Sequence, residues 1–231
     1  MEEQSNQSHW IPLADLMTGL MLVFMLLAAA FMMRVEQTTT LVVKEYEETK
    51  SDLLQALQKE FATDLKQWNA ELLGDMTIRF NDPTVLFTTG SADLKPQFKD
   101  ILGRFFPRYV ALITSGKYRS AIKEIRIEGH TSAVWQGQSD QKNAYFLNMA
   151  LSQARTRSAL EYVLRLPSVE EDQQWLIGHV TANGLSSSKP ISRDEKTEKA
   201  QLTNQRVEFR IVTNASDRMD QIARDLKAGN P

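Results

Sequence analysis

A single apolar stretch near the start of the chain limits what this protein can fold into. Residues 11–33 read IPLADLMTGLMLVFMLLAAAFMM, and Asp15 is the only charged residue among them. At 1.5 Å per residue, a helix of this length covers roughly 35 Å, which exceeds the ~30 Å hydrocarbon core of a bilayer. Trp10 and Arg34 flank the stretch, as is typical of residues at a membrane interface. We therefore predict one transmembrane helix over residues 11–33.

A cleaved signal peptide is the alternative interpretation of this stretch, with the run Ala28–Ala30 as a conceivable cleavage region. Signal peptides carry Lys or Arg ahead of an apolar core of about 7–15 residues. The first ten residues contain neither Lys nor Arg, and the apolar stretch is longer than such a core. These features favour an uncleaved anchor with a short tail over residues 1–10.

Asp15 is the residue of the span with the clearest chemical meaning. A carboxylate at the centre of a span costs roughly 2.5–3.5 kcal/mol, but Asp15 lies only about 6 Å from the start of the span, so its side chain could reach the interface. The functional alternative is a carboxylate that carries protons or ions along a polar path. Thr18 and Gly19 share its helix face and allow another helix to approach closely. This alternative requires partner helices, because one helix cannot form a channel.

Composition excludes several function classes for this chain of 231 residues. The formal net charge of −2 argues against nucleic-acid binding, which needs a basic surface to neutralise phosphates. The chain contains no cysteine, so it has neither disulfides nor a thiolate metal site. Its three histidines, His9, His130 and His179, lack metal-ligand spacing, and no Gly-rich phosphate loop is recognisable. We therefore expect no metal and no cofactor.

Residues 34–75 are predicted to form a helical linker between the span and the following domain. For residues 36–50 a solvated spacer is an equally good interpretation. Over residues 51–73, apolar side chains recur every three or four positions and mark one face of a helix. They are Leu53, Leu57, Phe61, Leu65, Trp68 and Leu72. Such a narrow stripe suits either dimerisation with a second copy or packing on the downstream domain.

Residues 76–213 alternate between strand and helix patterns, which predicts an α+β domain with helices on one face of a small mixed sheet. The expected strands are Met76–Phe80, Val85–Phe87, Ile122–Glu128, Val180–Ala182 and Val207–Val212. The expected helices are Leu94–Ile113, Ala144–Leu166 and Val169–Ile177. Residues 214–231 are expected to be a tail, with a candidate amphipathic helix over Ser216–Lys227.

Four segments of this domain occur together in a fixed order. They are VLFTTGSADLKPQFKDIL at 85–102, IEGHTS at 127–132, NMALSQART at 148–156, and the run from Gly184 that ends in NQRVEFRI. This set resembles the OmpA-like peptidoglycan-binding domain. The span, with its early Asp, resembles the start of MotB-type stator subunits. Within that group the chain resembles the ZorB family of Zorya anti-phage systems, through its short non-basic tail, EGHTS in place of GHTD, and the long loop from Ala133 to Asn143.

The resemblance implies a cell-wall-anchored subunit of a proton-driven rotary stator. Two copies would sit within a ring of MotA-like (ZorA-like) subunits in the inner membrane, with the N-terminus cytoplasmic and the C-terminal domain in the periplasm. Asp15 would relay the ion, and the scarcity of polar residues in the span favours H⁺ over Na⁺. No covalent chemistry is implied, so the chain is not expected to be an enzyme. A flagellar stator subunit and a passive membrane-to-peptidoglycan tether are the alternatives.

The flanking charges conflict with this orientation. The ten residues before the span carry no Lys or Arg, whereas Arg34, Lys44 and Lys50 follow it. By the positive-inside rule alone, the C-terminal domain would be cytoplasmic. The resemblance implies the opposite, and we adopt it as the expectation.

Residues for peptidoglycan binding follow from the same resemblance. The diaminopimelate of a stem peptide presents carboxylates and an amine, and the planar guanidinium of Arg155 fits a carboxylate. Asn148 lies two helical turns before Arg155, so the two share a helix face with Leu151 between them. Arg206 is either a second anion contact or a partner of the region around Glu208. The expected set is His130, Thr131, Ser132, Asn148, Leu151, Arg155 and Arg206.

One position departs from the family pattern. The Asp of the GHTD motif meets the ammonium group of the ligand in the family, and this chain has the uncharged Ser132 there. Asp140, in the following loop, is a candidate replacement. His130 is expected to order the loop rather than to bind a metal.

Overall fold

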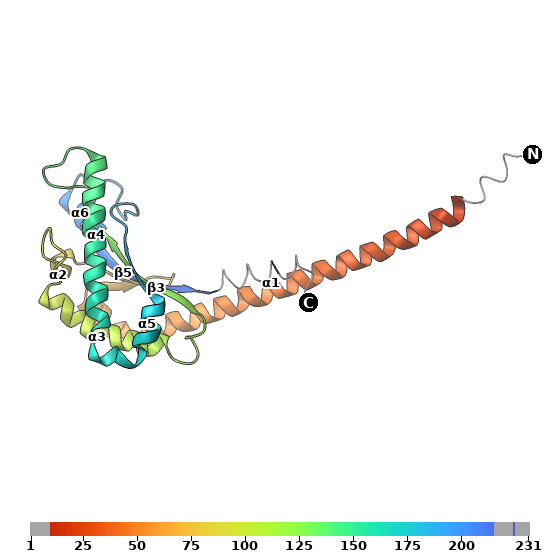
Figure 1. Ribbon diagram of the computed structural model, residues 1–231, viewed down its shortest axis with the longest axis horizontal. Helices are drawn as coiled ribbons and strands as arrows, with labels where there is room; N and C mark the ends of the chain where they lie inside the picture. Colours follow the sequence, from red (N-terminus) through yellow and green to blue (C-terminus); the bar gives the residue numbers. More distant parts are fainter. Residues whose placement is uncertain (1–9, 215–223, 225–231) are drawn as a thin grey trace, which may run out of the picture. The chain divides into compact units, whose positions relative to one another are not determined.

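The computed structural model describes residues 10–214 and residue 224 (Figure 1). The chain forms two compact units, of which the first comprises Met1–Glu47 and Ala215–Pro231 and the second covers Glu48–Asn214. The expected tails, 1–10 and 214–231, lie outside the described residues except for Trp10, Asn214 and Arg224, and so does the candidate helix over Ser216–Lys227 apart from Arg224.

The first unit consists of the N-terminal part of helix α1, which runs from Trp10 to Gln67. Within α1, the segment Pro12–Gln37 has a mean hydropathy of 2.4, and none of its most apolar window is buried. It is the one helix among the described residues that is long and apolar enough to cross a membrane. An entirely exposed apolar surface of this length needs an apolar environment, which agrees with the predicted span.

The last part of α1 belongs to the core of the second unit. Leu53, Leu57 and Phe61 are almost fully buried there. The helix ends at Gln67 because Asn69 adopts a left-handed backbone with φ of 48°, a conformation that Asn tolerates. Leu72, which the stripe places on the helix, instead lies in a strand, because the chain reverses after this turn. Between the two alternatives for the stripe, this structure has it packed on the downstream domain.

The second unit contains a five-stranded sheet in the order β1-β2-β5-β3-β4. The strands are β1 (Ala70–Leu72), β2 (Thr77–Phe80), β3 (Ile122–His130), β4 (Val180–Gly184) and β5 (Arg206–Thr213). Strands β3 and β4 are parallel, and the other neighbours are antiparallel, so the sheet is mixed. The parallel pair is joined by a helical crossover, as parallel neighbours require.

The helices of this unit match the three expected helical regions and add two short helices, Pro83–Leu86 and Glu198–Asn204, that the sequence pattern does not predict. They are α2 (Pro83–Leu86), α3 (Pro96–Ile113), α4 (Gln141–Leu164), η1 (Pro167–Asp172), α5 (Gln173–His179) and α6 (Glu198–Asn204). The strand expected at Val85–Phe87 is wrong. Asp82 caps α2 by accepting a hydrogen bond from the Thr84 N–H, and Pro83 occupies the first turn, so the chain coils there. Phe87 then forms only an isolated bridge with Leu94.

One face of the sheet carries the hydrophobic core. Phe80 of β2 and Phe209 of β5 contact Phe105 of α3, with ring centroids 5.4 and 5.1 Å apart. Phe61 of α1 contacts the same Phe105 ring at 5.3 Å. Such tilted and edge-on aromatic pairs add to the free energy of burying these rings. The α+β class, with helices on one face of a mixed sheet, is thereby confirmed.

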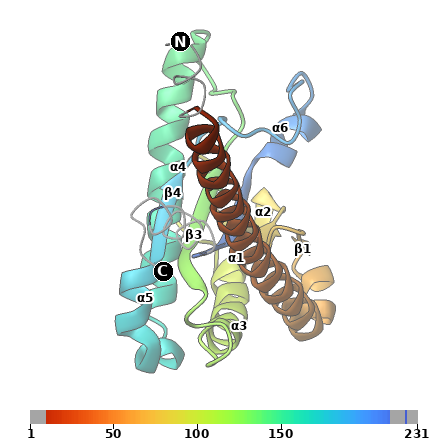
Figure 2. The same cartoon turned by 90° about the vertical axis from the view of Figure 1, so that its right-hand side faces the viewer.

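Helix α4 packs unusually close to strands β3 and β4, beside which it runs in Figure 2. Its buried residues are small: Ala144, Asn148, Ser152, Thr156, Ala159 and Val163. A Cβ at Gly129 would lie 2.6 Å from the Thr156 side chain, and one at Gly184 would lie 2.3 Å from the Gln153 backbone nitrogen. Glycine at these two positions therefore permits the approach that brings the α4 side chains beside the ends of both strands.

Candidate functional site

The predicted ion-relay residues lie on the exposed surface of the first unit. Asp15, Thr18 and Gly19 occupy consecutive turns of α1, and all three are exposed. The Thr18 hydroxyl donates to the Ala14 carbonyl at 2.7 Å, which satisfies this polar group within the helix. A Cβ at Gly19 would meet no atom within 4 Å. This face therefore presents a carboxylate beside a surface that another helix can approach.

The predicted wall-binding residues cluster where β3 ends and α4 begins. Thr131 and Ser132, which follow β3, are both buried. The Ser132 hydroxyl and the Asn148 amide both donate to the Val134 carbonyl, at 3.3 and 3.2 Å. Asn148 thus ties the loop that follows the GHTS segment to the first half of α4. The structure brings these three polar residues together, as the resemblance implies.

A second anchor of this loop comes from the segment after β4. The Thr131 N–H donates to the Ser186 carbonyl at 3.0 Å, and the Ser186 N–H donates to the Ser152 hydroxyl at 3.1 Å. Ser186 is fully buried and has a φ of 50°. These hydrogen bonds connect β3, α4 and the β4–α6 segment, so the site rests on two regular elements and the irregular segment between β4 and α6.

Arg155 lies seven residues after Asn148 on α4, with the half-buried Leu151 between them. Its Nε donates to the Ser91 carbonyl at 2.9 Å, and its guanidinium lies 5.0 Å from the centroid of the Phe87 ring. Burial lowers the pKa of Arg155 to about 10, and the group remains charged at neutral pH. The described hydrogen bond of Arg155 uses Nε, so its Nη atoms can donate to a carboxylate in a fork-shaped contact.

A narrow pocket joins Arg155 to the ends of β3 and β5. Its lining includes Phe87, His130, Arg155 and Arg206. The volume is about 10 Å³, close to the lower limit for one water molecule. This volume is too small for a ligand group larger than water unless side chains move.

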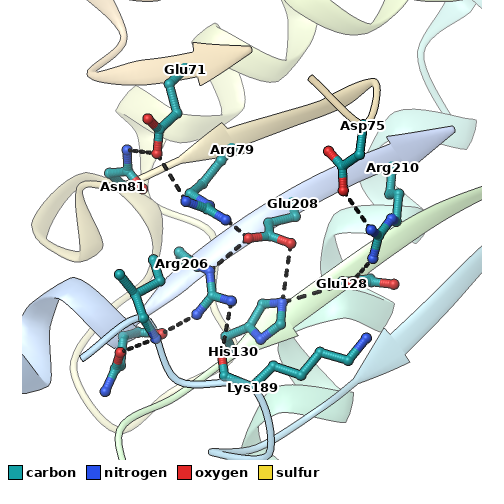
Figure 3. Close-up of polar contacts among 12 residues, drawn as sticks. Glu71, Asp75, Arg79, Asn81, Glu128, His130, Lys189, Arg206, Glu208 and Arg210 are labelled. Carbon is teal, nitrogen blue, oxygen red and sulfur yellow. Dashed lines mark hydrogen bonds and ion pairs between the residues drawn. The ribbon is translucent and has the colours of Figure 1, made fainter. Parts of the chain in front are cut away.

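A buried ionic network lies on the face of the sheet opposite the core (Figure 3). Arg206 donates through Nε to Glu208 at 2.7 Å, and its other nitrogens donate to the carbonyls of Asn204 and Lys189. Arg79 donates to the same Glu208 oxygen at 2.7 Å. Arg206 is 5% exposed, so it is a partner of Glu208, and its described hydrogen bonds all go to protein groups.

His130 belongs to this network rather than to an open surface. Its Nε2 lies 3.5 Å from Glu208 and 3.9 Å from Glu128, and the ring is almost fully buried. Burial lowers the pKa of His130, and the neighbouring Glu208 opposes this shift only in part. Burial raises the pKa of Glu208, but interactions with His130 and Arg206 outweigh it and hold that pKa well below its usual range. The arrangement fixes the strand end that leads into Thr131 and Ser132.

Glu128, His130 and Glu208 are also the described residues whose spacing comes nearest to a metal site, with one potential ligand atom each within 4.8 Å of the others. Two arginines already supply positive charge there: Arg206 binds Glu208, and Arg210 lies 4.0 Å from Glu128. A divalent cation would be repelled by both guanidinium groups. The distances therefore suit a metal, but the charges favour an ionic network.

No protein-family model matches the chain. The chain is 42% identical, over 228 residues, to the Zorya protein ZorB of Escherichia coli, and the match covers 97% of this chain and 95% of that protein. This chain belongs to the ZorB family. A MotB-like protein from Desulfovibrio vulgaris shares the fold, with a TM-score of 0.54 at 21% identity over 74% of this chain and 98% of that one. The ZorB-family identity and the OmpA-like α+β fold predicted from the motifs are thus confirmed.

Sequence reasoning missed two acidic residues of this ZorB-family site, Glu128 and Glu195, and named Glu208 only through the region that Arg206 could contact. Glu128 and Glu208 alternate with His130 and Arg206 along paired strands, and this alternation was the available signal. Glu195 gave no such signal, because it lies in an irregular segment between β4 and α6. Its carboxylate accepts a hydrogen bond from the Ala133 N–H at 2.7 Å, directly beside Ser132. Only the folded chain brings these two segments together.

Proposed function

We propose that this chain is the wall-binding, ion-relaying subunit of a Zorya-type rotary stator that protects bacteria against phage. The observation that carries the proposal is the 42% identity to ZorB along nearly the whole chain. The apolar helix ahead of an OmpA-like domain supports it, because a stator subunit needs both a membrane segment and an anchor. In this role two copies lie within a ring of MotA-like (ZorA-like) subunits. The chain itself catalyses no covalent chemistry.

The proposed topology places the N-terminus in the cytoplasm and the OmpA-like domain in the periplasm, with one crossing of the inner membrane over residues 11–33. Peptidoglycan is then within reach of the domain. The positive residues after the span oppose this orientation, so its support is the wall-binding fold rather than the charge distribution.

In the proposed mechanism, Asp15 takes up and releases a proton as ions cross between this helix and the surrounding ring. Ionisable residues within spans mark ion pathways, because a bare carboxylate in lipid is costly. Thr18 and Gly19 keep the same face narrow enough for a ring helix to approach. Rotation of the ring against the anchored pair follows from repeated protonation.

The proposed wall site is the mouth of the pocket at Arg155 together with the loop that Ser132 and Asn148 hold. Arg155 binds a carboxylate of the stem peptide, and the Leu151 side chain lies along the same face of α4. Thr131, His130 and Arg206 do not contact the ligand in this proposal. All three are buried, and they hold the strand ends in position.

The proposal is tested by Asp15→Asn in cells that carry the complete defence system. Asparagine keeps the size of the side chain but cannot be ionised, so we expect phage protection to be lost while membrane level and co-purification of the ring subunit stay normal. Asp15→Glu, which keeps a titratable group, is the matched control and should retain part of the protection. Full protection by the Asn variant would instead favour a passive tether.

A further inference from the structure

Glu195 supplies a carboxylate beside the position where this chain has Ser132. Its Oε2 accepts the Ala133 N–H at 2.7 Å, and the Asn204 side-chain amide contacts its Oε1. We infer that Glu195 binds the ammonium group of the wall peptide, opposite the carboxylate bound by Arg155. This inference rests on the proposed wall-binding function. It assigns to Glu195 the preference of the wall site for a ligand with a free amine.

The fold holds Glu195 in place through Asn204 at the end of α6. Asn204 is fully buried, and its side-chain oxygen accepts the N–H groups of Ile191 and Ser192 at 2.8 and 2.9 Å. Gln201 of the same helix donates to the Glu195 carbonyl at 2.9 Å. The irregular segment that carries Glu195 is therefore fixed at several points. A preorganised carboxylate loses little conformational entropy when it binds a cation.

The carboxylate of Glu195 retains capacity for a ligand. An ionised carboxylate offers about four acceptor positions, and the described hydrogen bonds use one on each oxygen. The residue is half-buried, so part of the group faces solvent. An ammonium group can approach from that side and form a charge-assisted hydrogen bond.

Glu195 and Arg155 suit an amine and a carboxylate that lie several bonds apart in one ligand. Glu195 contacts the loop at Ala133, and Asn148 holds the same loop through Val134. Arg155 lies seven residues further along α4, roughly 10 Å along the helix axis. Diaminopimelate in a stem peptide has a free ammonium at one end of its carbon chain and a carboxylate at the other end. The amine can therefore lie near Glu195 while the distant carboxylate reaches towards Arg155.

Two other carboxylates lie nearby and fit the role less well. Asp140 caps α4 by accepting the Lys142 N–H at 3.0 Å, so it is committed to the helix start. Asp93 accepts from the Ser91 hydroxyl at 2.7 Å, beside the carbonyl that Arg155 contacts. It therefore lies at the cationic end of the site rather than opposite it.

The test measures binding of two soluble peptides to the full-length chain in detergent by calorimetry. One is the tripeptide L-Ala-γ-D-Glu-meso-diaminopimelate, and the other is the same peptide acetylated on the free amine of diaminopimelate. We expect the natural chain to prefer the free amine by about tenfold or more, the range of a hydrogen bond between charged groups. Glu195→Gln, which keeps the size and one acceptor, should bind both peptides equally.

Three further variants separate the outcomes. Asp140→Asn keeps a good helix cap and should retain the preference. Arg155→Ala should weaken binding of both peptides by a similar factor. Glu195→Asp keeps the charge and should retain part of the preference even if the loop shifts. Thermal unfolding of each variant shows whether its fold is intact.

The experiment distinguishes failure of the proposed wall-binding function from failure of the inference about Glu195. If the natural chain binds neither peptide, the wall-binding function is wrong, and the inference falls with it. If the natural chain binds and Arg155→Ala weakens binding, but Glu195→Gln keeps the preference for the free amine, the inference is wrong and wall binding stands. Loss of the preference in Asp140→Asn alone would assign the role to Asp140 and likewise overturn the inference.

Discussion

At the scale of single residues, charge and burial assign roles that residue type alone does not. Arg155 and Arg206 are both arginines within the OmpA-like motifs, yet they differ in what they can do. Arg206 donates a hydrogen bond from Nε to Glu208, and its other nitrogens donate to the carbonyls of Asn204 and Lys189. Arg155 uses only Nε in its described hydrogen bonds, although it lines the same narrow pocket. Arg155 therefore keeps hydrogen-bond donors for the proposed wall ligand, whereas the donors of Arg206 are engaged within the protein.

His130 leads to a prediction about pH. Its pKa is lowered by burial, so the folded state binds a proton less readily than the unfolded chain. The contribution to stability is fully present above the ordinary histidine pKa of about 6.5 and is lost as the pH falls below it. We expect the temperature of the unfolding midpoint of the second unit to decrease as the pH is lowered from about 7.5 to about 5.5. Glu128, Glu208 and Arg206 face the ring, and the pKa of Glu208 is held well below its usual range, so Glu208 does not titrate in this interval.

The pH prediction is measured by thermal unfolding at a series of pH values. His130→Gln should lower the midpoint overall and flatten its dependence on pH in this interval. His179→Gln, at the other described histidine, is the control and should retain the slope. An unchanged slope in the His130 variant would show that another group is responsible.

At the scale of elements, the end of α1 acts as part of the domain. Arg108 of α3 donates to Glu60 at 2.7 Å and to Asp64 at 2.8 Å, and its guanidinium lies 4.9 Å from the Phe61 ring centroid. These ion pairs are partly exposed and contribute little each. The burial of the apolar stripe contributes more, because each large side chain there is removed from water. The same face is consequently unavailable to a second copy.

Phe61→Ala tests this view of α1. The ring is fully buried against Phe105, and its removal leaves a cavity, so we expect a loss of about 3–5 kcal/mol in the free energy of unfolding. Denaturant unfolding of the full chain in detergent measures the change. Lys59→Ala, on the exposed side of the same helix, should change stability by less than about 0.5 kcal/mol. A mild effect of the Phe61 variant would mean that the helix end packs only loosely.

At the scale of the whole molecule, the orientation of the chain in the membrane decides whether the proposed wall-binding function is feasible. A domain that binds peptidoglycan must lie on the periplasmic side, whereas the basic residues after the span favour the cytoplasm. The two arguments have different physical origins. Charge bias acts during insertion, whereas the proposed wall-binding function concerns where the folded domain acts.

Reporter fusions after Pro231 resolve the orientation. We expect alkaline phosphatase, which is active only in the periplasm, to be active in the fusion, and green fluorescent protein to be dark when it is exported through the same pathway. Fusions to a cytoplasmic protein and to an exported protein are the controls. A fluorescent, phosphatase-negative result would remove the wall-binding function.

The sequence by itself determined the apolar helix, the α+β class and the family, because these depend on local pattern and on motifs that are contiguous in the chain. Hydropathy over residues 11–33 needs no tertiary contact to be recognised, and the buried strands β3 and β5 carry strong alternation. The strand expected at Val85–Phe87 failed because the capping residue Asp82 and Pro83 outweighed β propensity over so short a segment.

Only the tertiary structure decided which charged residues meet. Glu128, Arg206 and Glu208 are brought together by pairing between β3 and β5, two strands that are far apart in the chain. Glu195 reaches Ala133 across 62 positions of sequence, through a segment without regular periodicity. Periodicity reports which face a residue occupies, but it does not report which distant residue lies opposite. Sequence alone therefore points to Asp140, which is near Ser132 in the chain, whereas the fold places Glu195 beside Ser132.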